Sequence, residues 1–440
     1  MLTRQFFITA VSDEQHPVDN KIGKAIVDRI VRAHQAAEEF RVTILMPAVP
    51  AFAGDLQSDG ALGTRAIMEF QYNSINRGGH SIIESLRQAG IPDPSRYIGF
   101  YNLRNFDRIN VSPAMRRAEQ ESGVSYESAR KEFDEAAESG ADQYGREPTH
   151  GRLGDQYERY QQAADKIQDQ TWDTISACYM NAGPDLGAVP WTGSPEAELN
   201  AFVSEELYIH SKVLIADDRL VICGSANLND RSQLGTHDSE IAVVIEDPTP
   251  VRTTMRGAPF VAGRFAASLR RQLFRKHLGL LPDQRWDRPD ANFSPVTKEP
   301  NAYDWDSPAD RLVEDPMSDN FLRLWANTAR LNTEAFSDVF HNVPNDRVRN
   351  WDQYQDFFSR HFVIPGAEAK DENGQPLPTE GKVDYGHVVP GYPGGLQAVK
   401  EKLGTIRGNL VEMPLDFLIE VDDIAKEGLS LNSFTDELYT

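Results

Sequence analysis

The stretch Tyr208-Ile-His-Ser-Lys-Val-Leu-Ile-Ala-Asp217 decides the fold, because it reads as one strand that ends in a tight turn. Its second half is apolar, and the pair Asp217-Asp218 is typical of a tight turn. Residues 219–224 then read as a returning strand. Side chains alternate along a strand, so His210 and Lys212 are predicted to project from the same face. An imidazole and an ammonium group would then share one pocket.

A short polar loop, Gly224-Ser-Ala-Asn227, follows the returning strand. Its glycine permits a sharp turn, and the hydroxyl of Ser225 and the amide of Asn227 become hydrogen-bond donors. A carboxylate follows at Glu240, where a further strand is predicted to begin. We therefore expect these polar groups to lie beside the start of the first strand.

This combination of side chains suits phosphoryl transfer. Lys212 and Asn227 can neutralise and hydrogen-bond the non-bridging oxygens of a phosphodiester, which carry the charge of the transition state. His210 can act as nucleophile or general acid, and a carboxylate such as Glu240 can fix its tautomer. The chemistry needs neither a metal ion nor another cofactor.

A histidine followed two residues later by a lysine occurs easily by chance in 440 residues, so that pair alone indicates little. Of the ten histidines, however, only His210 has this neighbour. The pair is joined by Asp217 seven residues after the histidine, by the polar loop and by Glu240. The whole combination therefore favours a functional site over coincidence.

The rest of the chain alternates strand-like and helix-like patterns. Buried strands are predicted over residues 5–11, 41–46, 97–101, 206–216, 219–224 and 240–246. Helices are predicted over residues 22–37, 62–77, 80–89, 260–277 and 321–340, with Asp19 and Asn20 as candidate caps for the first. The predicted fold class is therefore α/β, a mixed β-sheet flanked by helices in an αβα sandwich.

Composition shifts divide the chain into four predicted parts. These are 1–111, the first part of the α/β lobe; 112–204, a charged helical insertion; 205–281, the rest of the lobe with the motif; and 282–440, a connector with helices and an acidic tail.

The net charge of −22, from 45 basic and 67 acidic residues, argues against a nucleic-acid partner, which requires a basic surface. Two cysteines are too few for a disulfide framework and fit a reducing compartment. No apolar stretch is long enough to cross a membrane, and Phe6–Val11 is too short for a signal peptide. We therefore expect a cytoplasmic protein.

The motif residues resemble the second His-x-Lys-x4-Asp motif of eukaryotic phospholipase D, in a fungal-like form. The resemblance includes Gln5-Phe-Phe-Ile8, Arg77-Gly-Gly-His-Ser-Ile82 and Asn409-Leu-Val-Glu-Met-Pro-Leu-Asp-Phe-Leu418. It covers residues 5–110 and 205–440 with good specificity. It implies that this chain forms one lobe of a two-lobed fold.

In that family, one motif from each half meets at a pseudo-twofold axis. One histidine attacks phosphorus to form a phosphohistidine, and the other protonates the leaving head group of phosphatidylcholine or a related glycerophospholipid. Water then releases phosphatidic acid. The resemblance implies these roles: His210 as acid and base, Lys212 and Asn227 as phosphate ligands, Ser225 as their support, Glu240 as the group that orients His210, and Asp217 in the turn.

This chain contains no first motif, so we expect it to hold half of an active site and to be incomplete. Three hypotheses follow. The chain is part of a phospholipase D acting on phospholipid at a membrane surface, to which it binds peripherally, together with the missing lobe. Alternatively, two copies form a homodimeric phosphodiesterase, or the chain is a catalytically silent binding protein.

Overall fold

The computed structural model describes residues 1–51, 55–57, 59–109, 113–126, 128–133, 154–167, 191, 193–281, 303–363 and 381–425. The chain divides into two compact units. The larger comprises Met1–Phe106, Pro195–Pro282 and Tyr303–Thr440, and the smaller comprises Asp107–Ser194 and Asp283–Ala302. Much of the predicted insertion, the start of the connector and the acidic tail lie outside the described residues. The four predicted domain boundaries remain a prediction.

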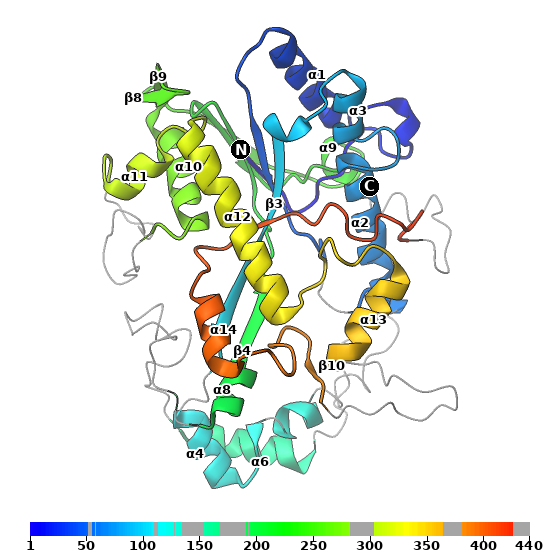
Figure 1. Cartoon of the computed structure of the whole chain (residues 1–440), viewed down its shortest axis with the longest axis vertical. Coiled ribbons are helices and arrows are strands. Elements are labelled where there is room, and N and C mark those ends of the chain that lie inside the picture. The colour runs from blue at the N-terminus through cyan, green and yellow to red at the C-terminus, as the bar shows by residue number, and fades with distance from the viewer. Residues whose placement is uncertain are drawn as a thin grey trace. The chain divides into compact units, whose positions relative to one another are not determined.

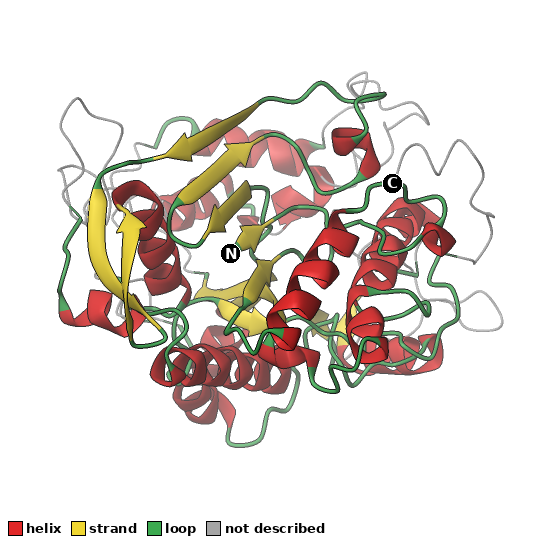
Figure 2. Cartoon of the chain, turned by 90° about the horizontal axis from the view of Figure 1, so that it is seen from above, coloured by secondary structure: helices red, strands yellow, loops and turns green. Residues whose placement is uncertain are grey.

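The larger unit is built on a mixed eight-stranded sheet with the order β12-β3-β2-β1-β5-β6-β7, in which β4 also pairs with β3 (Figures 1 and 2). Its strands are β1 (Leu2–Thr3), β2 (Val42–Leu45), β3 (Ile98–Arg108), β4 (Phe202–Glu206), β5 (Lys212–Ala216), β6 (Leu220–Gly224), β7 (Ala242–Glu246) and β12 (Leu410–Glu412). Pairing is parallel between β1, β2 and β3, and antiparallel from β1 through β5 and β6 to β7. The predicted α/β fold class is confirmed.

Helices surround this sheet. They are α1 (Ile22–Gln35), α2 (Leu62–Ile75), α3 (Ile82–Gln88), α8 (Pro195–Ala201), α9 (Asp230–Gln233), α10 (Arg264–His277), α11 (Pro308–Val313), α12 (Asp319–Phe340), α13 (Trp351–His361) and α14 (Gly395–Leu403), with short 3₁₀ turns at Asp13–Gln15, Asp59–Ala61 and Pro94–Arg96. Two small sheets pair β8 (Pro250–Met255) with β9 (Ala258–Gly263) and β10 (Phe362–Val363) with β11 (Val383–Asp384).

Alternation along the central strands explains why helices cover both faces of the sheet. Ile44 packs in a cluster with residues of α1, α2 and α3, whereas the next residue, Leu45, packs with α10 and α12. Phe100 and Tyr101 divide between the same two clusters. Successive side chains of a strand point to opposite faces, so strands that are apolar throughout require cover on both sides.

The smaller unit contains α4 (Pro113–Ser122) and α6 (Asp155–Ala164). A small apolar cluster holds it together, formed by Ala118, Val124, Ala129 and Tyr160. Each of these side chains comes from a charged, amphipathic stretch, so the described helices bury one narrow face each.

The strand predicted over residues 5–11 is wrong, although Phe7 and Ile8 are fully buried. The main-chain N–H groups of this segment bond largely outside the sheet ladder. That of Phe7 donates to Gln71 Oε1 at 3.2 Å, and that of Thr9 donates to Ser74 Oγ at 2.9 Å. Polar side chains of α2 thus replace a neighbouring strand as hydrogen-bond partners.

Two further expectations need correction. Asp19 and Asn20 do not cap α1, because its N-cap residue is Lys21, which makes no side-chain cap hydrogen bond; the main-chain N–H groups of Asp19 and Asn20 donate to the carboxylate of Asp230. The helix predicted over 260–277 begins only at Arg264, since Ala258–Gly263 pairs with β8 as a strand.

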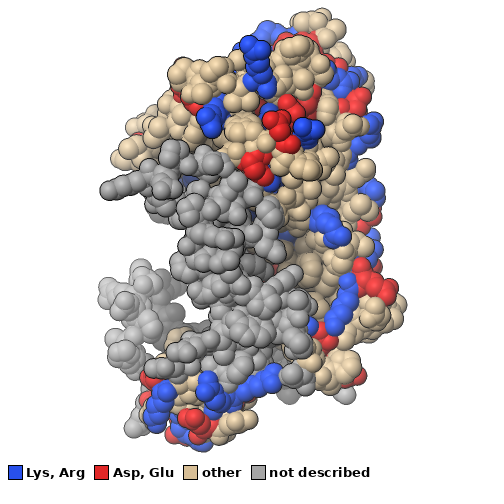
Figure 3. Space-filling model, turned by 90° about the vertical axis from the view of Figure 1, so that its left-hand side faces the viewer, with Lys and Arg blue, Asp and Glu red and all other residues tan. Residues whose placement is uncertain are grey.

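The described surface carries mixed charge. On the face shown in Figure 3, Lys and Arg side chains are interspersed with Asp and Glu, without an extended basic stripe among the coloured residues. Within the described ranges, no helix combines the length and apolarity needed to cross a bilayer.

Candidate active site

His210 lies just before β5, outside any strand. The single strand predicted over 206–216 is two strands, because β4 ends at Glu206 and β5 begins at Lys212. The imidazole is exposed and lies beside the ring of Tyr208, with ring centroids 6.3 Å apart at 30°. The His210 ring makes no hydrogen bond to another described residue, so it remains accessible to a substrate.

Lys212 is the buried cation of the site, with 7% of its surface exposed. Its Nζ donates to the main-chain carbonyl oxygen of His210 at 2.6 Å and to Gln5 Oε1 at 2.7 Å. Burial lowers the pKa of Lys212, the charge of Glu240 acts to raise it, and that of Arg4 acts to lower it. The ammonium is thus held in place by neutral oxygens, with a carboxylate within electrostatic range.

A hydrogen-bonded chain of side chains extends from Lys212 towards Tyr208. Gln5 accepts from Lys212 and donates through Nε2 to the hydroxyl of Tyr208 at 2.8 Å, which donates to the carbonyl oxygen of Pro50 at 2.7 Å. Neither Gln5 nor Tyr208 was predicted to take part in the site. No local pattern indicates the contact between Gln5 and Lys212, because the two residues are 207 positions apart in the sequence.

The β5–β6 hairpin places the polar loop next to Lys212. Asp217 and Asp218 both have φ of +51°, a left-handed conformation, in the three-residue turn between Ala216 and Leu220, which pair across the hairpin. The resulting register sets Lys212 opposite Gly224. A Cβ at Gly224 would collide with the carbonyl oxygen of Ile241, so glycine is required there. Ser225 therefore begins its loop directly beside the lysine strand.

Glu240 organises that loop. One of its oxygens accepts from the hydroxyl of Ser225, and the other accepts from Ser232 Oγ at 2.6 Å. Ser232 Oγ in turn accepts from the main-chain N–H of Asn227 at 3.0 Å. Asn227 Oδ1 is buried and has no hydrogen-bond partner among the described residues. Ser232 is a further residue of the site that sequence reasoning missed.

The structure thus joins Ser225, Ser232 and Glu240 in one hydrogen-bonded network and holds Lys212 within electrostatic range of Glu240, but it gives the imidazole of His210 no bond to either. The role predicted for Glu240, orientation of His210, remains a prediction, because its carboxylate is engaged by Ser225 and Ser232. Asp217 is exposed in the turn. The adjacent Asp218 is buried and forms a bidentate ion pair with Arg270, with contacts of 3.0 and 2.6 Å.

These features provide the parts of an anion site. The ends of neighbouring strands carry the ammonium of the buried Lys212 and the loop with the hydroxyl of Ser225 and the amide of Asn227. The accessible imidazole of His210 precedes the first of these strands. Such preorganised donors stabilise charge on oxygen, and a neighbouring imidazole can transfer a proton.

Comparisons with known proteins point to the same chemistry. A family model described as phospholipase D matches residues 187–307, which include the motif and its loop. The chain is 30% identical to human phospholipase D1 over 420 residues, 95% of this chain and 26% of that protein. It is 28% identical to phospholipase D zeta 1 of Arabidopsis thaliana over 422 residues, 96% of this chain and 28% of that protein.

A fungal relative is also similar. The chain is 33% identical to phospholipase D1 of Schizosaccharomyces pombe over 284 residues, 64% of this chain and 14% of that protein. The chain spans about a quarter of the length of the human and plant relatives. The resemblance to eukaryotic phospholipase D is confirmed.

Proposed function

Because the chain belongs to the eukaryotic phospholipase D family, we propose that it supplies one half of a phosphodiesterase active site. The observation that carries this proposal is the position of Lys212, a buried residue whose ammonium is bonded to the main chain of His210 and whose backbone pairs with Gly224, the residue before Ser225. A buried cation beside an accessible imidazole supports binding of an anionic phosphodiester.

The substrate is phosphatidylcholine or a related glycerophospholipid. Lys212 and Asn227 hold the non-bridging oxygens, and Ser225 supports them through Glu240. An imidazole from a second motif attacks phosphorus while the bond to the head-group oxygen breaks, and His210 gives that oxygen a proton. His210 then takes a proton from water, which attacks the phosphorus of the phosphohistidine, breaks the bond to the imidazole nitrogen and releases phosphatidic acid.

The second imidazole comes from a partner, since one nucleophile and one acid must lie on opposite sides of phosphorus. The partner is a lobe carrying the other motif or a second copy of this chain. The exposure of the His210 ring leaves it accessible to either partner. The protein works in the cytoplasm at the surface of membranes that contain its substrate, and the isolated monomer is poorly active.

Choline release from a short-chain phosphatidylcholine tests this proposal. The chain is assayed alone over a wide concentration range, and again with a polypeptide that carries another His-x-Lys-x4-Asp motif. Release that rises with the square of chain concentration supports a second copy, and release that requires the added polypeptide supports the missing lobe. Absence of release under both conditions would overturn the proposal in favour of a silent binding protein.

A further inference from the structure

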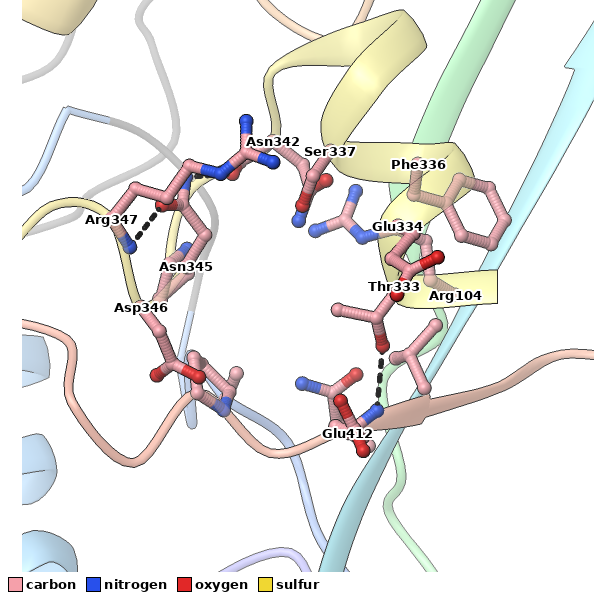
Figure 4. A pocket seen from close by; sticks show the side chains of 15 residues that line it. Arg104, Thr333, Glu334, Phe336, Ser337, Asn342, Asn345, Asp346, Arg347 and Glu412 are labelled. Atoms are coloured by element: carbon pink, nitrogen blue, oxygen red, sulfur yellow. Dashed lines mark hydrogen bonds between the residues drawn. The ribbon is translucent and has the colours of Figure 1, made fainter. Parts of the chain in front are cut away.

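A cavity of about 180 Å³ with both polar and apolar lining residues lies in the larger unit, and neither His210 nor Lys212 lines it (Figure 4). Its walls come from β3, β12, the second half of α12 and the loop 342–347. In the sheet, β3 and β12 are separated from β5, β6 and β7 by β2 and β1. None of the residues that line the cavity belongs to the hydrogen-bonded groups around Lys212 and Glu240.

Two arginines line one end of the cavity. Arg104 is 7% exposed, and its Nη1 donates to Ser204 Oγ at 3.2 Å. Figure 4 shows its guanidinium directed into the cavity, with that of Arg347 lying near Asn342 and Ser337. Within the described part of the chain, neither guanidinium has a carboxylate within ion-pair distance, although the charge of Arg104 acts to lower the pKa of Glu206. A buried arginine without such a partner favours an anion.

Carboxylates line the other end. Figure 4 places Asp346 and Glu412 across the cavity from the two guanidinium groups. Burial is the main cause that raises the pKa of each, and the charge of Asp346 raises that of Glu412 further. A bound cation would favour the charged form of both carboxylates and offset their mutual repulsion.

The cavity also has a fixed frame of neutral groups. Asn345 Nδ2 donates to the carbonyl oxygen of Asn342 at 2.6 Å, and Asn345 Oδ1 accepts from the main-chain N–H of Arg347 at 2.9 Å. The main-chain N–H of Glu412 donates to Thr333 Oγ1 at 2.9 Å. Asn342 Oδ1 is buried and has no partner among the described residues, so it can accept a hydrogen bond from a ligand.

We propose that this cavity binds a small zwitterion, with its anionic group on Arg104 and Arg347 and its ammonium group on Asp346 and Glu412. The cavity is large enough for a small organic ion, since a single water molecule needs only ~10–15 Å³ of such a volume. A ligand with a single charge would pair with the charged side chains at one end of the cavity and leave those at the other end without a partner. Phosphate-bearing amines and amino acids share the required chemistry, and binding does not depend on the proposed phosphodiesterase.

Isothermal titration calorimetry of the whole chain tests the proposal. The probes are O-phosphoethanolamine and γ-aminobutyrate, which carry phosphate and carboxylate respectively, with ethanolamine and inorganic phosphate as singly charged controls. We expect one or both zwitterions to bind at least about tenfold more tightly than either control, because two charge-assisted contacts form together. The preferred zwitterion identifies the source of the anionic group.

Variants locate the binding. Arg347→Gln and Glu412→Gln change exposed residues and are expected to weaken binding by about tenfold or more each. Arg323→Gln and Glu401→Gln remove exposed charges outside the cavity and should leave it unchanged. The proposal would be overturned if ethanolamine or phosphate alone bound as tightly as the zwitterions, or if no saturable binding occurred up to about 10 mM. It would also be overturned if Arg347→Gln and Glu412→Gln bound the zwitterions as tightly as the native chain does.

Discussion

Lys212 Nζ donates a hydrogen bond to the main-chain carbonyl oxygen of His210 at 2.6 Å, so the cation is bonded to the backbone of the histidine rather than to its ring. The contact ties the start of β5 to the segment that precedes it. It leaves the His210 imidazole exposed and fixes the ammonium beside it, which permits the two groups to act on different atoms of one phosphodiester.

Replacement of His210 should affect catalysis and not folding. His210→Gln removes an exposed ring without a hydrogen bond among the described residues, so urea unfolding should be unchanged within about 0.5 kcal/mol. Choline release in the active assembly should fall by about 10²-fold or more, since a positioned general acid contributes that much. His237→Gln, also exposed, is the control and should retain activity. Equal rates in both variants would remove His210 from the mechanism.

Glu240 should set the upper pH limit of the site. Its charge acts to raise the pKa of Lys212, against the lowering caused by burial. Glu240→Gln removes that charge, so Lys212 should lose its proton at a lower pH than in the native chain. The alkaline limb of the pH profile for choline release should therefore move down. Glu246→Gln, at the far end of β7, serves as control. A limb that stays in place would contradict the electrostatic coupling.

The turn after β5 should depend on Asp218 rather than on Asp217. Asp218 forms a buried ion pair with Arg270, and its loss would leave an uncompensated buried charge. Asp218→Asn should reduce the free energy of unfolding in urea by about 3 kcal/mol. Asp217→Asn is a matched control, because Asp217 is exposed and has the same φ of +51°. Similar losses in both variants would show that the turn conformation, and not the ion pair, is responsible.

Glu206 should make stability fall as pH rises. Burial raises its pKa to about 7, from an ordinary value of 4.5. Its favourable contribution is therefore complete below pH 4.5 and is lost as pH rises through about 7, a change of roughly 3 kcal/mol. Glu206→Gln does not titrate, so the difference in unfolding free energy between the native chain and this variant should change by that amount between pH 4.5 and 8. A constant difference across this range would contradict the raised pKa.

Local sequence patterns predicted those parts of the site whose residues are close in the chain better than those that depend on distant partners. The turn at Asp217-Asp218 and the loop at Gly224 follow from residue types with strong backbone preferences. The strand over 5–11 was predicted wrongly because its hydrogen-bond partners, Gln71 and Ser74, lie more than 60 residues away. The pattern of apolar residues does not indicate that side chains of a helix will accept hydrogen bonds from the main-chain N–H groups of this segment.

The site residues that were not predicted from the sequence are those whose partners are distant in the chain. Gln5 reaches Lys212 only because β1 pairs with β5, and Ser232 reaches Glu240 only after β7 aligns with β6. The interruption between β4 and β5 was also not predicted. The main-chain N–H of Leu207 donates to the carbonyl oxygen of Leu103, and no local pattern indicates a partner so distant in sequence. The zwitterion cavity combines β3, α12 and β12, which are distant in sequence and carry no shared motif.

The response of the His210 imidazole to a phosphodiester tests the half-site most directly. The ¹⁵N shifts of this ring are followed by NMR as dihexanoyl phosphatidylcholine is added below its micelle concentration. We predict a saturable shift in the native chain and a loss of affinity of about 10²-fold in Lys212→Met, which keeps an apolar stem of similar length in place of the buried one. An unchanged titration in Lys212→Met, or no shift of His210 in the native chain, would contradict the account.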